Sequence, residues 1–249
     1  MQIDKNKILE VCQLAWLAGK KIIKIYSKEF KIFKKKDMSP VTLADLESEQ
    51  VIVNGLKKIF NNPIIFSEET NNKNKKNINN FWLVDPLDGT KEFIKKNGEF
   101  TVNIAFIKNK KPILGIIYAP ILKKTYVGIK NNTYKIINKK KFKKIKSKKI
   151  IEKKMIISRS HSTKSEVNRL MQKYKIKKVL FLGSSLKFCY IAEGKAHFYP
   201  RSGTTYEWDT AAGHAIVNGI GGKIKTSKGR DLEYGKKNFK NTNFIAKAY

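Results

Sequence analysis

Two aspartates three positions apart, Asp85 and Asp88, flank a proline and precede a Gly-Thr pair in the segment FWLVDPLDGTKEFI, residues 81–94. Carboxylates held this close raise each other's pKa unless a positive charge lies between them. Lysines spread over the surface are one source of such charge, and a bound metal cation is another. Hard divalent cations such as Mg²⁺ take oxygen ligands in octahedral geometry. The motif is therefore a candidate magnesium site.

The residues between and after these aspartates have chemical uses of their own. Pro86 fixes its φ angle and stiffens the link between the two carboxylates. The Leu87 carbonyl lies between them and could be a third oxygen ligand. Gly89 permits a tight turn, and the N–H groups of Gly89, Thr90 and Lys91 at a helix start could hold a phosphate. The Thr90 hydroxyl could orient an attacking water.

More carboxylates fall where the chain changes structure. The chain has seven aspartates, of which Asp45 lies in the first turn of an expected helix and Asp209 opens another, while Glu68 and Glu69 end the run IIFSEE. Each has an ordinary alternative. Asp45 forms a T-x-x-D capping pattern with Thr42, Asp209 suits a helix N-cap, and DPLDGT alone suits a turn. Together, however, Asp45, the Glu68-Glu69 pair, the DPLDGT motif and Asp209 favour a cation-binding cleft.

The composition is that of a folded protein with an extreme charge. The chain has 249 residues, 41% of them hydrophobic, and a formal net charge of +33. That charge suggests nucleic acid, but it is almost all lysine, with four arginines in the chain, and the lysines are spread along it with Asn and Ile, as in KKIFNN. We interpret the charge as a compositional bias with a solvated surface. A functional polycation, or nonspecific contact with anionic lipid or RNA at low salt, is the alternative.

The cysteine count and the N-terminus indicate a reducing compartment. Cys12 and Cys189 lie in apolar periodic stretches and are expected to be buried, reduced thiols. The start MQIDKNKILE lacks the layout of a signal peptide, and no apolar run approaches the roughly 20 residues of a membrane span. We expect a soluble cytoplasmic protein, with peripheral contact to the cytoplasmic face of the inner membrane left open.

The first half of the chain reads as helices followed by a β-meander. Apolar periodicity predicts a helix over residues 8–26, and Thr42 is a natural N-cap for a second helix that ends before Pro63. The elements expected after it are a buried strand over 63–69, a mobile loop over 71–80, a strand over 81–85, a short helix or turn over 89–94, and strands over 99–120 and 125–139 with a hairpin tip at Asn131-Asn132.

The second half alternates strand and helix. The expected elements are strands at 155–158, 179–182 and 196–201 and helices at 164–174, 185–194 and 209–222. The lysine-rich run 139–154 is the expected boundary. The prediction is an N-terminal α+β subdomain over 1–138 that carries most metal ligands, a basic connector over 139–154, and a C-terminal α/β subdomain over 155–249.

Three segments resemble the signatures of a known family. SEE, WLVDPLDGTKEFI and WDTAAGHAI resemble the motifs of the inositol monophosphatase superfamily of Mg²⁺-dependent, lithium-sensitive phosphatases. SPVTLAD, NGEFTVNIA, PILGIIYAP, ISRSH and GSSLKFC are similar to its bacterial 3'(2'),5'-bisphosphate nucleotidase branch, and Lys91, Glu92 and Phe93 replace the Thr-Asn-Phe run of inositol monophosphatases. The resemblance is collinear over nearly the whole chain. It implies an α/β (α+β) layered αβαβα sandwich of the sugar-phosphatase type.

The resemblance also implies roles for individual residues. It makes Glu68, Asp85 and the Leu87 carbonyl ligands of one Mg²⁺, and Asp85, Asp88 and Asp209 ligands of a second. It makes Asp45 and Thr90, with Glu68, the catalytic set that orients and deprotonates a water, sometimes with a third metal. The residues that it places against the substrate are Glu68, Leu87, Asp88, Gly89, Thr90, His161, Ser184, Lys187, Arg201 and Asp209, of which His161, Ser184, Lys187 and Arg201 contact the nucleotide. By residue type alone, His161 and Lys187 also suit a solvated surface.

The activity implied is hydrolysis of the 3'-phosphate of adenosine 3',5'-bisphosphate to AMP and phosphate, by in-line attack of metal-activated water. The sulfated analogue, 3'-phosphoadenylyl sulfate, is a second implied substrate, which ties the activity to sulfate assimilation. The partner is then a small nucleotide bisphosphate, with no specific nucleic acid, and nothing in the sequence specifies an oligomeric state. The alternatives are an inositol or sugar phosphatase of the same superfamily and a polycationic RNA- or membrane-surface binder.

Overall fold

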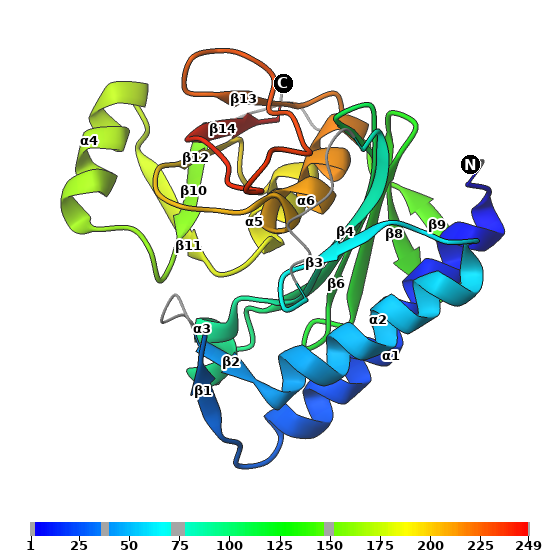
Figure 1. Ribbon diagram of the computed structural model, residues 1–249. Helices are drawn as coiled ribbons and strands as arrows, with labels where there is room; N and C mark the ends of the chain where they lie inside the picture. Colours follow the sequence, from blue (N-terminus) through cyan, green and yellow to red (C-terminus); the bar gives the residue numbers. More distant parts are fainter. Residues whose placement is uncertain (1–2, 36–39, 71–77, 147–151, 249) are drawn as a thin grey trace.

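The computed structural model describes residues 3–35, 40–70, 78–146 and 152–248. They form five layers in the order helix, sheet, helix, sheet, helix (Figure 1). This arrangement confirms the αβαβα sandwich. Most of the expected mobile loop at 71–80 lies outside the described residues.

The first layer is a pair of helices, α1 (Lys5–Tyr26) and α2 (Leu43–Ile59), which lie side by side on one face of the larger sheet (Figure 1). Their apolar stripes are buried there, as the periodicity predicts. Thr42 caps α2 through its side chain, and Asp45 completes a capping box with it. The start of α2 is thereby fixed, and with it the position of the Asp45 carboxylate.

The second layer is a seven-stranded sheet that follows chain order. Its strands are β3 (Ile65–Ser67), β4 (Asn80–Asp88), β5 (Thr101–Lys108), β6 (Lys111–Ala119), β7 (Lys124–Ile129), β8 (Asn132–Ile137) and β9 (Lys141–Lys144). Only the β3–β4 pair is parallel among them. The tip of the β7–β8 hairpin is Lys130–Asn131, one residue earlier than expected, because both residues have positive φ, as a two-residue type I′ turn requires.

The middle layer holds α5 (Leu186–Ala192) and α6 (Glu207–Gly219), which lie between the two sheets (Figure 1). Helix α6 approaches the large sheet very closely at two glycines. A Cβ added to Gly115 would lie 2.3 Å from the Ala212 carbonyl oxygen, and one added to Gly128 would lie 2.3 Å from the Ala215 carbonyl carbon. These glycines therefore let α6 sit against β6 and β7, which fixes the start of α6 relative to the strands.

The last two layers are a five-stranded sheet and the helix on its outer face. The sheet has the order β11 (Lys178–Leu182), β10 (Lys154–Ser158), β12 (Phe198–Arg201), β14 (Phe244–Lys247), β13 (Lys223–Thr226). Helix α4 (Lys164–Tyr174) covers its outer face through a small apolar cluster that includes Met155, Ile157 and Val167. A separate two-stranded ribbon, β1 (Ile32–Lys34) and β2 (Pro40–Thr42), lies beside the short helix α3 (Thr90–Ile94) (Figure 1).

Several expectations are confirmed and some are corrected. Helix α4 has the expected bounds, and Cys12 and Cys189 are buried free thiols. Helix α6 begins at Glu207, two residues before the expected start. Strand β9 lies within the expected connector 139–154, because its backbone hydrogen bonds with β8 stabilise a strand there despite the run of lysines. The division into 1–138, 139–154 and 155–249 stays a prediction.

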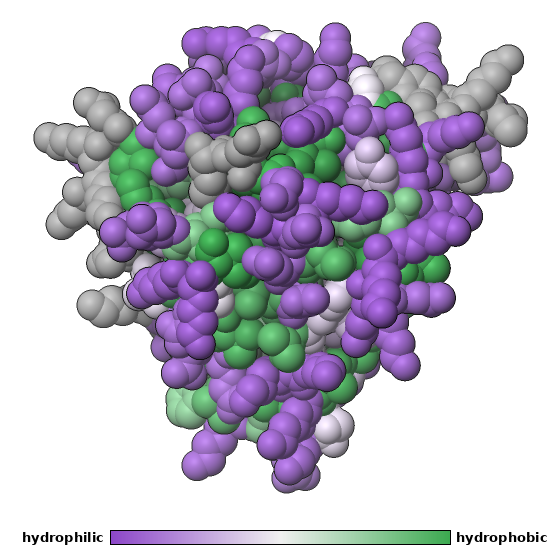
Figure 2. Space-filling model, turned by 90° about the vertical axis from the view of Figure 1, so that its right-hand side faces the viewer, coloured by the Kyte–Doolittle hydropathy of each residue, from purple (hydrophilic) through white to green (hydrophobic). Residues whose placement is uncertain are grey.

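The surface is rich in charge. Figure 2, which shows the molecule from the side of α1 and α2, has hydrophilic side chains over most of the face with hydrophobic ones showing between them. On these two helices Leu17 and Leu46 are about half exposed. None of the helices in the described residues has the length and apolar character needed to cross a membrane.

Candidate active site

The end of β4 carries an irregularity at the DPLD motif. Asp85 pairs with Asn103 and Asp88 with Thr101, so a step of three residues on β4 faces a step of two on β5. Such a bulge bends the strand and redirects its side chains. The Leu87 N–H donates to Asp85 Oδ1 over 3.1 Å, which stabilises the bulge. Both aspartates are thereby held at the end of the strand.

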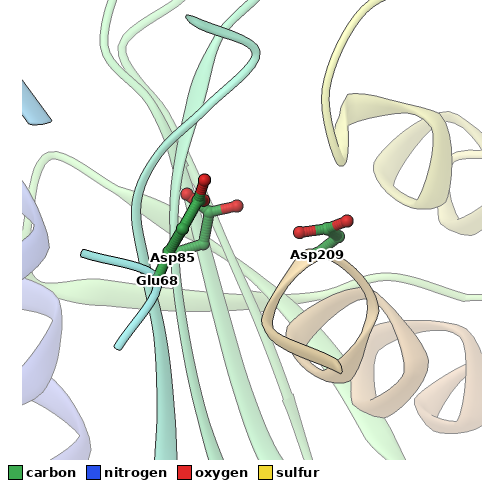
Figure 3. A group of neighbouring side chains, drawn as sticks. All are labelled: Glu68, Asp85 and Asp209. Atoms are coloured by element: carbon green, nitrogen blue, oxygen red, sulfur yellow. The ribbon is translucent and has the colours of Figure 1, made fainter. Parts of the chain in front are cut away.

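Three carboxylates from separate elements converge beside this bulge. Glu68 follows β3, Asp85 lies on β4 and Asp209 lies in the first turn of α6, and one oxygen of each lies within 4.8 Å of the others. Figure 3 shows Glu68 and Asp85 adjacent to each other, with Asp209 facing them across a gap. It is the one such group of metal-type ligands among the described residues.

The cluster is electrostatically unfavourable without a cation. Burial raises the pKa of Asp85 well above its ordinary value, and the charges of Glu68, Asp88 and Asp209 raise it further. Burial likewise raises the pKa of Asp209, followed by the charges of Asp88 and Glu68. Carboxylate oxygens are the donors that Mg²⁺ prefers. The residues present therefore fit a hard divalent cation.

Asp88 lies beside the cluster and is anchored on one oxygen. Its Oδ2 accepts hydrogen bonds from Asn103 Nδ2 at 3.1 Å and from the Ser185 N–H at 2.5 Å. Burial raises its pKa to about 6, against the lowering effects of Lys187 and of these hydrogen bonds. Ser185 is the N-cap of α5, which follows strand β11 of the small sheet. Its hydrogen bond to Asp88 therefore links the small sheet to the DPLD motif on the large sheet.

Asp45 and Thr90 form a hydrogen-bonded pair next to the cluster. Thr90 Oγ1 lies 3.3 Å from Asp45 Oδ1, while Asp45 Oδ2 accepts from the N–H and the hydroxyl of Thr42 at 2.7 Å each. Asp45 is almost fully buried, and burial raises its pKa to about 6. The capping and the catalytic interpretations of Asp45 are thus compatible, since each uses a different oxygen.

Asp209 also has a structural role, but not the expected one. It is the third residue of α6, and its Oδ2 accepts from the Tyr206 N–H at 2.9 Å, so it closes a capping box instead of serving as the N-cap. The reason is that α6 begins two residues earlier, at Glu207. The buried Glu207 carboxylate accepts from the N–H groups of Gly235 at 2.6 Å and Lys236 at 2.9 Å.

One lysine that contacts the carboxylate cluster was not predicted from the sequence. Lys35 Nζ lies 2.7 Å from Glu68 Oε1 and 2.6 Å from Glu69 Oε1. Burial opposes the charge of Lys35, but the two carboxylates outweigh it and raise its pKa. Burial and the neighbouring Glu68 raise the pKa of Glu69 to about 7. A single lysine in so lysine-rich a chain carries no signal that could have singled it out.

The cluster lies at one side of a pocket of about 430 Å³. The residues predicted for the site that line it are Glu68, Asp85, Leu87, Asp88, Gly89, Thr90, His161, Ser184, Lys187, Arg201 and Asp209. Asp45 is the exception and lies behind Thr90. The pocket is also lined by Tyr199 and by Tyr206, whose ring stacks on Trp208 with centroids 5.1 Å apart. Tyr199 lies in β12, where aromatic residues are usually core, and Tyr206 is the residue before α6, so the sequence did not reveal these two.

The pocket is also lined by basic side chains, and His161, Lys187 and Arg201 are here called its basic end, as the carboxylate cluster is its acidic end. Lys187 is buried, and its Nζ donates to the carbonyls of Leu182 at 3.2 Å and Ser184 at 2.5 Å. Burial lowers its pKa to about 8. Burial and the charges of Lys91, Arg201, Lys187 and Lys95 lower the pKa of His161 to about 4, so its imidazole is neutral at pH 7. The pocket therefore has an acidic and a basic end.

Known proteins share both sequence and structure with this chain. A family model described as the inositol monophosphatase family matches residues 4–248. The 3'(2'),5'-bisphosphate nucleotidase CysQ of Buchnera aphidicola is 46% identical over 99% of this chain and 95% of its own length, and that of Escherichia coli K12 is 41% identical over 96% and 99%. The crystal structure of CysQ from Bacteroides thetaiotaomicron covers 98% of this chain and 97% of its own, with a TM-score of 0.82 and 35% identity.

Proposed function

The chain belongs to the inositol monophosphatase family, and on that premise we propose that it is a phosphatase of the 3'(2'),5'-bisphosphate nucleotidase type. It would hydrolyse adenosine 3',5'-bisphosphate to AMP and phosphate. The two relatives named above, with 46% and 41% identity, are called 3'(2'),5'-bisphosphate nucleotidases. The activity agrees with the similarity of its motifs to the nucleotidase branch.

The observation that carries the proposal is the two-ended pocket. Its acidic end groups Glu68, Asp85 and Asp209, while its basic end holds Lys187 and Arg201. A substrate with a phosphate at each end satisfies both, because a cation can join one phosphate to the carboxylates and the basic side chains can bind the other. A monophosphate of a neutral polyol would leave the basic end without an anion.

We assign Mg²⁺ to the acidic end. Glu68, Asp85 and the Leu87 carbonyl would hold one ion, and Asp85, Asp88 and Asp209 a second, with a third as an option beside Asp45 and Thr90. Bound Mg²⁺ supplies Lewis-acid neutralisation of the phosphate charge and makes water more acidic. The support is the chemistry of the donor set, in which buried carboxylates raise one another's pKa.

The protein's own residues would orient and deprotonate the water. The Thr90 hydroxyl lies 3.3 Å from both Asp45 Oδ1 and the Leu87 carbonyl oxygen. When it donates its hydrogen bond to Asp45, the lone pairs on Thr90 Oγ1 can accept one from a water in the pocket. Asp45 would then receive the proton through this hydroxyl. Water attacks in line with the leaving 3'-oxygen, and no covalent phosphoenzyme is expected.

The basic end would hold the nucleotide. Lys187 is fixed by two backbone carbonyls, and the neutral His161 can donate one hydrogen bond without adding charge. We extend the proposal to 3'-phosphoadenylyl sulfate as a second substrate, to a role in sulfate assimilation and to inhibition by Li⁺. A cytoplasmic location, with the basic surface touching anionic membrane, also stays a prediction.

Phosphate release tests the proposal. We expect adenosine 3',5'-bisphosphate to be hydrolysed with Mg²⁺, not after chelation, and more slowly with added Li⁺. The kcat/KM for this substrate should exceed that for inositol 1-phosphate by about a hundredfold, as two lost charged contacts would give. A preference for inositol 1-phosphate would replace the nucleotidase with a sugar phosphatase of the same family.

A further inference from the structure

A carboxylate outside the pocket joins the two sides of the molecule. Glu99, which precedes β5, accepts hydrogen bonds from Arg159 Nε at 2.7 Å, Arg159 Nη2 at 2.6 Å and the Gly183 N–H at 2.7 Å. The two bonds from Arg159 form the bidentate fork that a carboxylate matches best. Arg159 Nη2 also donates to the Phe181 carbonyl at 2.8 Å. One large-sheet residue thus ties together the turns after β10 and β11.

A second carboxylate supports the same turns from inside. Glu92 in α3 is buried and accepts from the Ser160 hydroxyl at 2.6 Å. Its side chain packs so closely on Gly183 that an added Cβ there would lie 2.4 Å from Glu92 Cγ. Ser160 immediately precedes His161, and Gly183 immediately precedes Ser184. Both turns that carry predicted nucleotide contacts are therefore held by carboxylates of the segment between β4 and β5.

The turn after β11 needs such support. Ser184 has a φ of 49°, in the left-handed region that a residue with a Cβ adopts at a cost. The neighbouring N–H groups hold it in that conformation, since Gly183 donates to Glu99 and Ser185 donates to Asp88 at 2.5 Å. Lys187 follows one turn later and donates back to the Ser184 carbonyl. Releasing Gly183 would let Ser184 and Lys187 shift together.

We propose that Glu99 and Arg159, here called the latch, are positioning residues that set the distance between the carboxylate cluster and the nucleotide-contacting turns, and so set the affinity for the second phosphate. Neither residue lines the pocket, so the latch acts through His161, Ser184 and Lys187. This inference rests on the proposed function. It adds to that function the residues that fix the spacing of the two ends.

The latch is charged at neutral pH. Burial raises the pKa of Glu99, but the hydrogen bonds from Arg159 and the Gly183 N–H outweigh it, and the pKa lies below its ordinary value. The Arg159 guanidinium is always protonated. The two residues of the latch therefore form an ion pair at neutral pH.

Kinetics of Arg159→Met and Glu99→Gln in the full chain test the proposal. We expect KM for adenosine 3',5'-bisphosphate to rise about tenfold, the loss typical of a hydrogen bond to a charged group, with kcat and the Mg²⁺ dependence within about twofold of wild type. Arg159→Lys, which keeps the charge without the fork, should be intermediate. Glu152→Gln is the matched control. Glu152 forms an ion pair with Lys178 at 3.0 Å, but this pair lies at the starts of β10 and β11, away from the turns that the latch holds.

The outcomes separate the latch from the substrate assignment. A KM within about twofold of wild type in both variants, or a changed Mg²⁺ dependence instead, would overturn the latch. Hydrogen exchange of the backbone amides of 182–187 in the substrate-free protein gives a readout without substrate. It should be faster in Arg159→Met than in wild type and Glu152→Gln. If wild type fails to hydrolyse the nucleotide, unchanged exchange overturns the latch, whereas faster exchange supports it and only the substrate assignment fails.

Discussion

The two ends of the pocket differ in how the protein holds and neutralises their charged side chains. The acidic end brings Glu68, Asp85 and Asp209 from three separate elements into one group of like charges, in which Asp85 is buried and the other two are partly buried. The basic end places Lys187 against backbone carbonyls, and Arg201 Nη2 donates to the Thr204 carbonyl at 3.3 Å. The acidic end is therefore electrostatically incomplete without a cation, whereas the basic end is preorganised by the protein itself.

This difference separates two functions. Substitutions at the acidic end should act on the chemical step and on the metal, and substitutions at the basic end on substrate binding. The predictions below test that separation, beginning with the largest effect.

Asp88→Asn should abolish turnover, with a fall in kcat of at least about a thousandfold, because a metal ligand and its charge are lost. The fold should be retained, since the amide can still accept the hydrogen bonds from Asn103 and Ser185. Phosphate release at saturating Mg²⁺ measures the effect. Asp231→Asn, at an exposed aspartate paired with Lys225, is the control. Near wild-type rate in Asp88→Asn would mean that the metal assignment is wrong.

Thr90→Val should lower kcat about a hundredfold, the usual size of a lost proton-transfer contact. The KM for the nucleotide should stay near wild type, because the basic end is unchanged. Thr90→Ser keeps the hydroxyl that lies 3.3 Å from Asp45 Oδ1 and should restore most of the rate. A serine variant as slow as the valine variant would contradict the role of the hydroxyl.

Lys187→Met should raise KM for adenosine 3',5'-bisphosphate about thirtyfold, which corresponds to about 2 kcal/mol for the loss of a desolvated charge that faces an anion. Its kcat should change far less. Lys178→Met, at an exposed lysine on the neighbouring strand, should behave as wild type. A loss confined to kcat would show that the two ends are not separable in this way.

The pH dependence of stability tests a titratable group outside the pocket, His214. Burial lowers the pKa of His214 on α6 to about 4, so the unfolded chain binds this proton first as the pH falls. The His214 contribution is present in full above about pH 6.5 and is lost as the pH falls towards 4. The raised pKa values of Asp85 and Asp209 act in the opposite sense, because their contribution grows as the pH falls.

Denaturant unfolding of wild type and His214→Gln between pH 7 and pH 4.5 separates these contributions. The difference in stability between the two should shrink or reverse at low pH, by on the order of 1–3 kcal/mol. A difference that does not depend on pH would show that His214 is not held neutral.

The acidic end could be predicted from the sequence because its residue types are rare here. Seven aspartates in a chain of net charge +33 make DPLDGT conspicuous. Its two aspartates also lie on one strand end, where spacing along the chain translates directly into spacing in the structure. Glu68 and Asp209 were candidates because they lie where the chain changes structure, and the resemblance added their roles as metal ligands, but their meeting depends on how α6 packs against the sheet.

The rest of the site and of the fold could not be predicted, because it depends on contacts between residues far apart in the chain. Lys35 and Arg159 meet their carboxylates across 33 and 60 residues, and no local pattern marks such pairs. Strands such as β9 and β13 escaped prediction because they are four residues long and rich in lysine, so their only signal is the partner strand. The start of α6 was misplaced because Glu207 is anchored by backbone N–H groups of residues 235 and 236.

Equilibrium binding of Mg²⁺ by isothermal titration calorimetry is the most direct test that Glu68, Asp85 and Asp209 belong to one cation-binding cluster, in which Asp209 is a ligand of the second ion. Wild type and the Asp231→Asn control should bind Mg²⁺ alike. Asp209→Asn should bind the second ion at least about tenfold more weakly, because one of its charged ligands is gone, while the ion held by Glu68, Asp85 and the Leu87 carbonyl should be less affected. Unchanged affinity in Asp209→Asn, or no binding in wild type, would contradict the account.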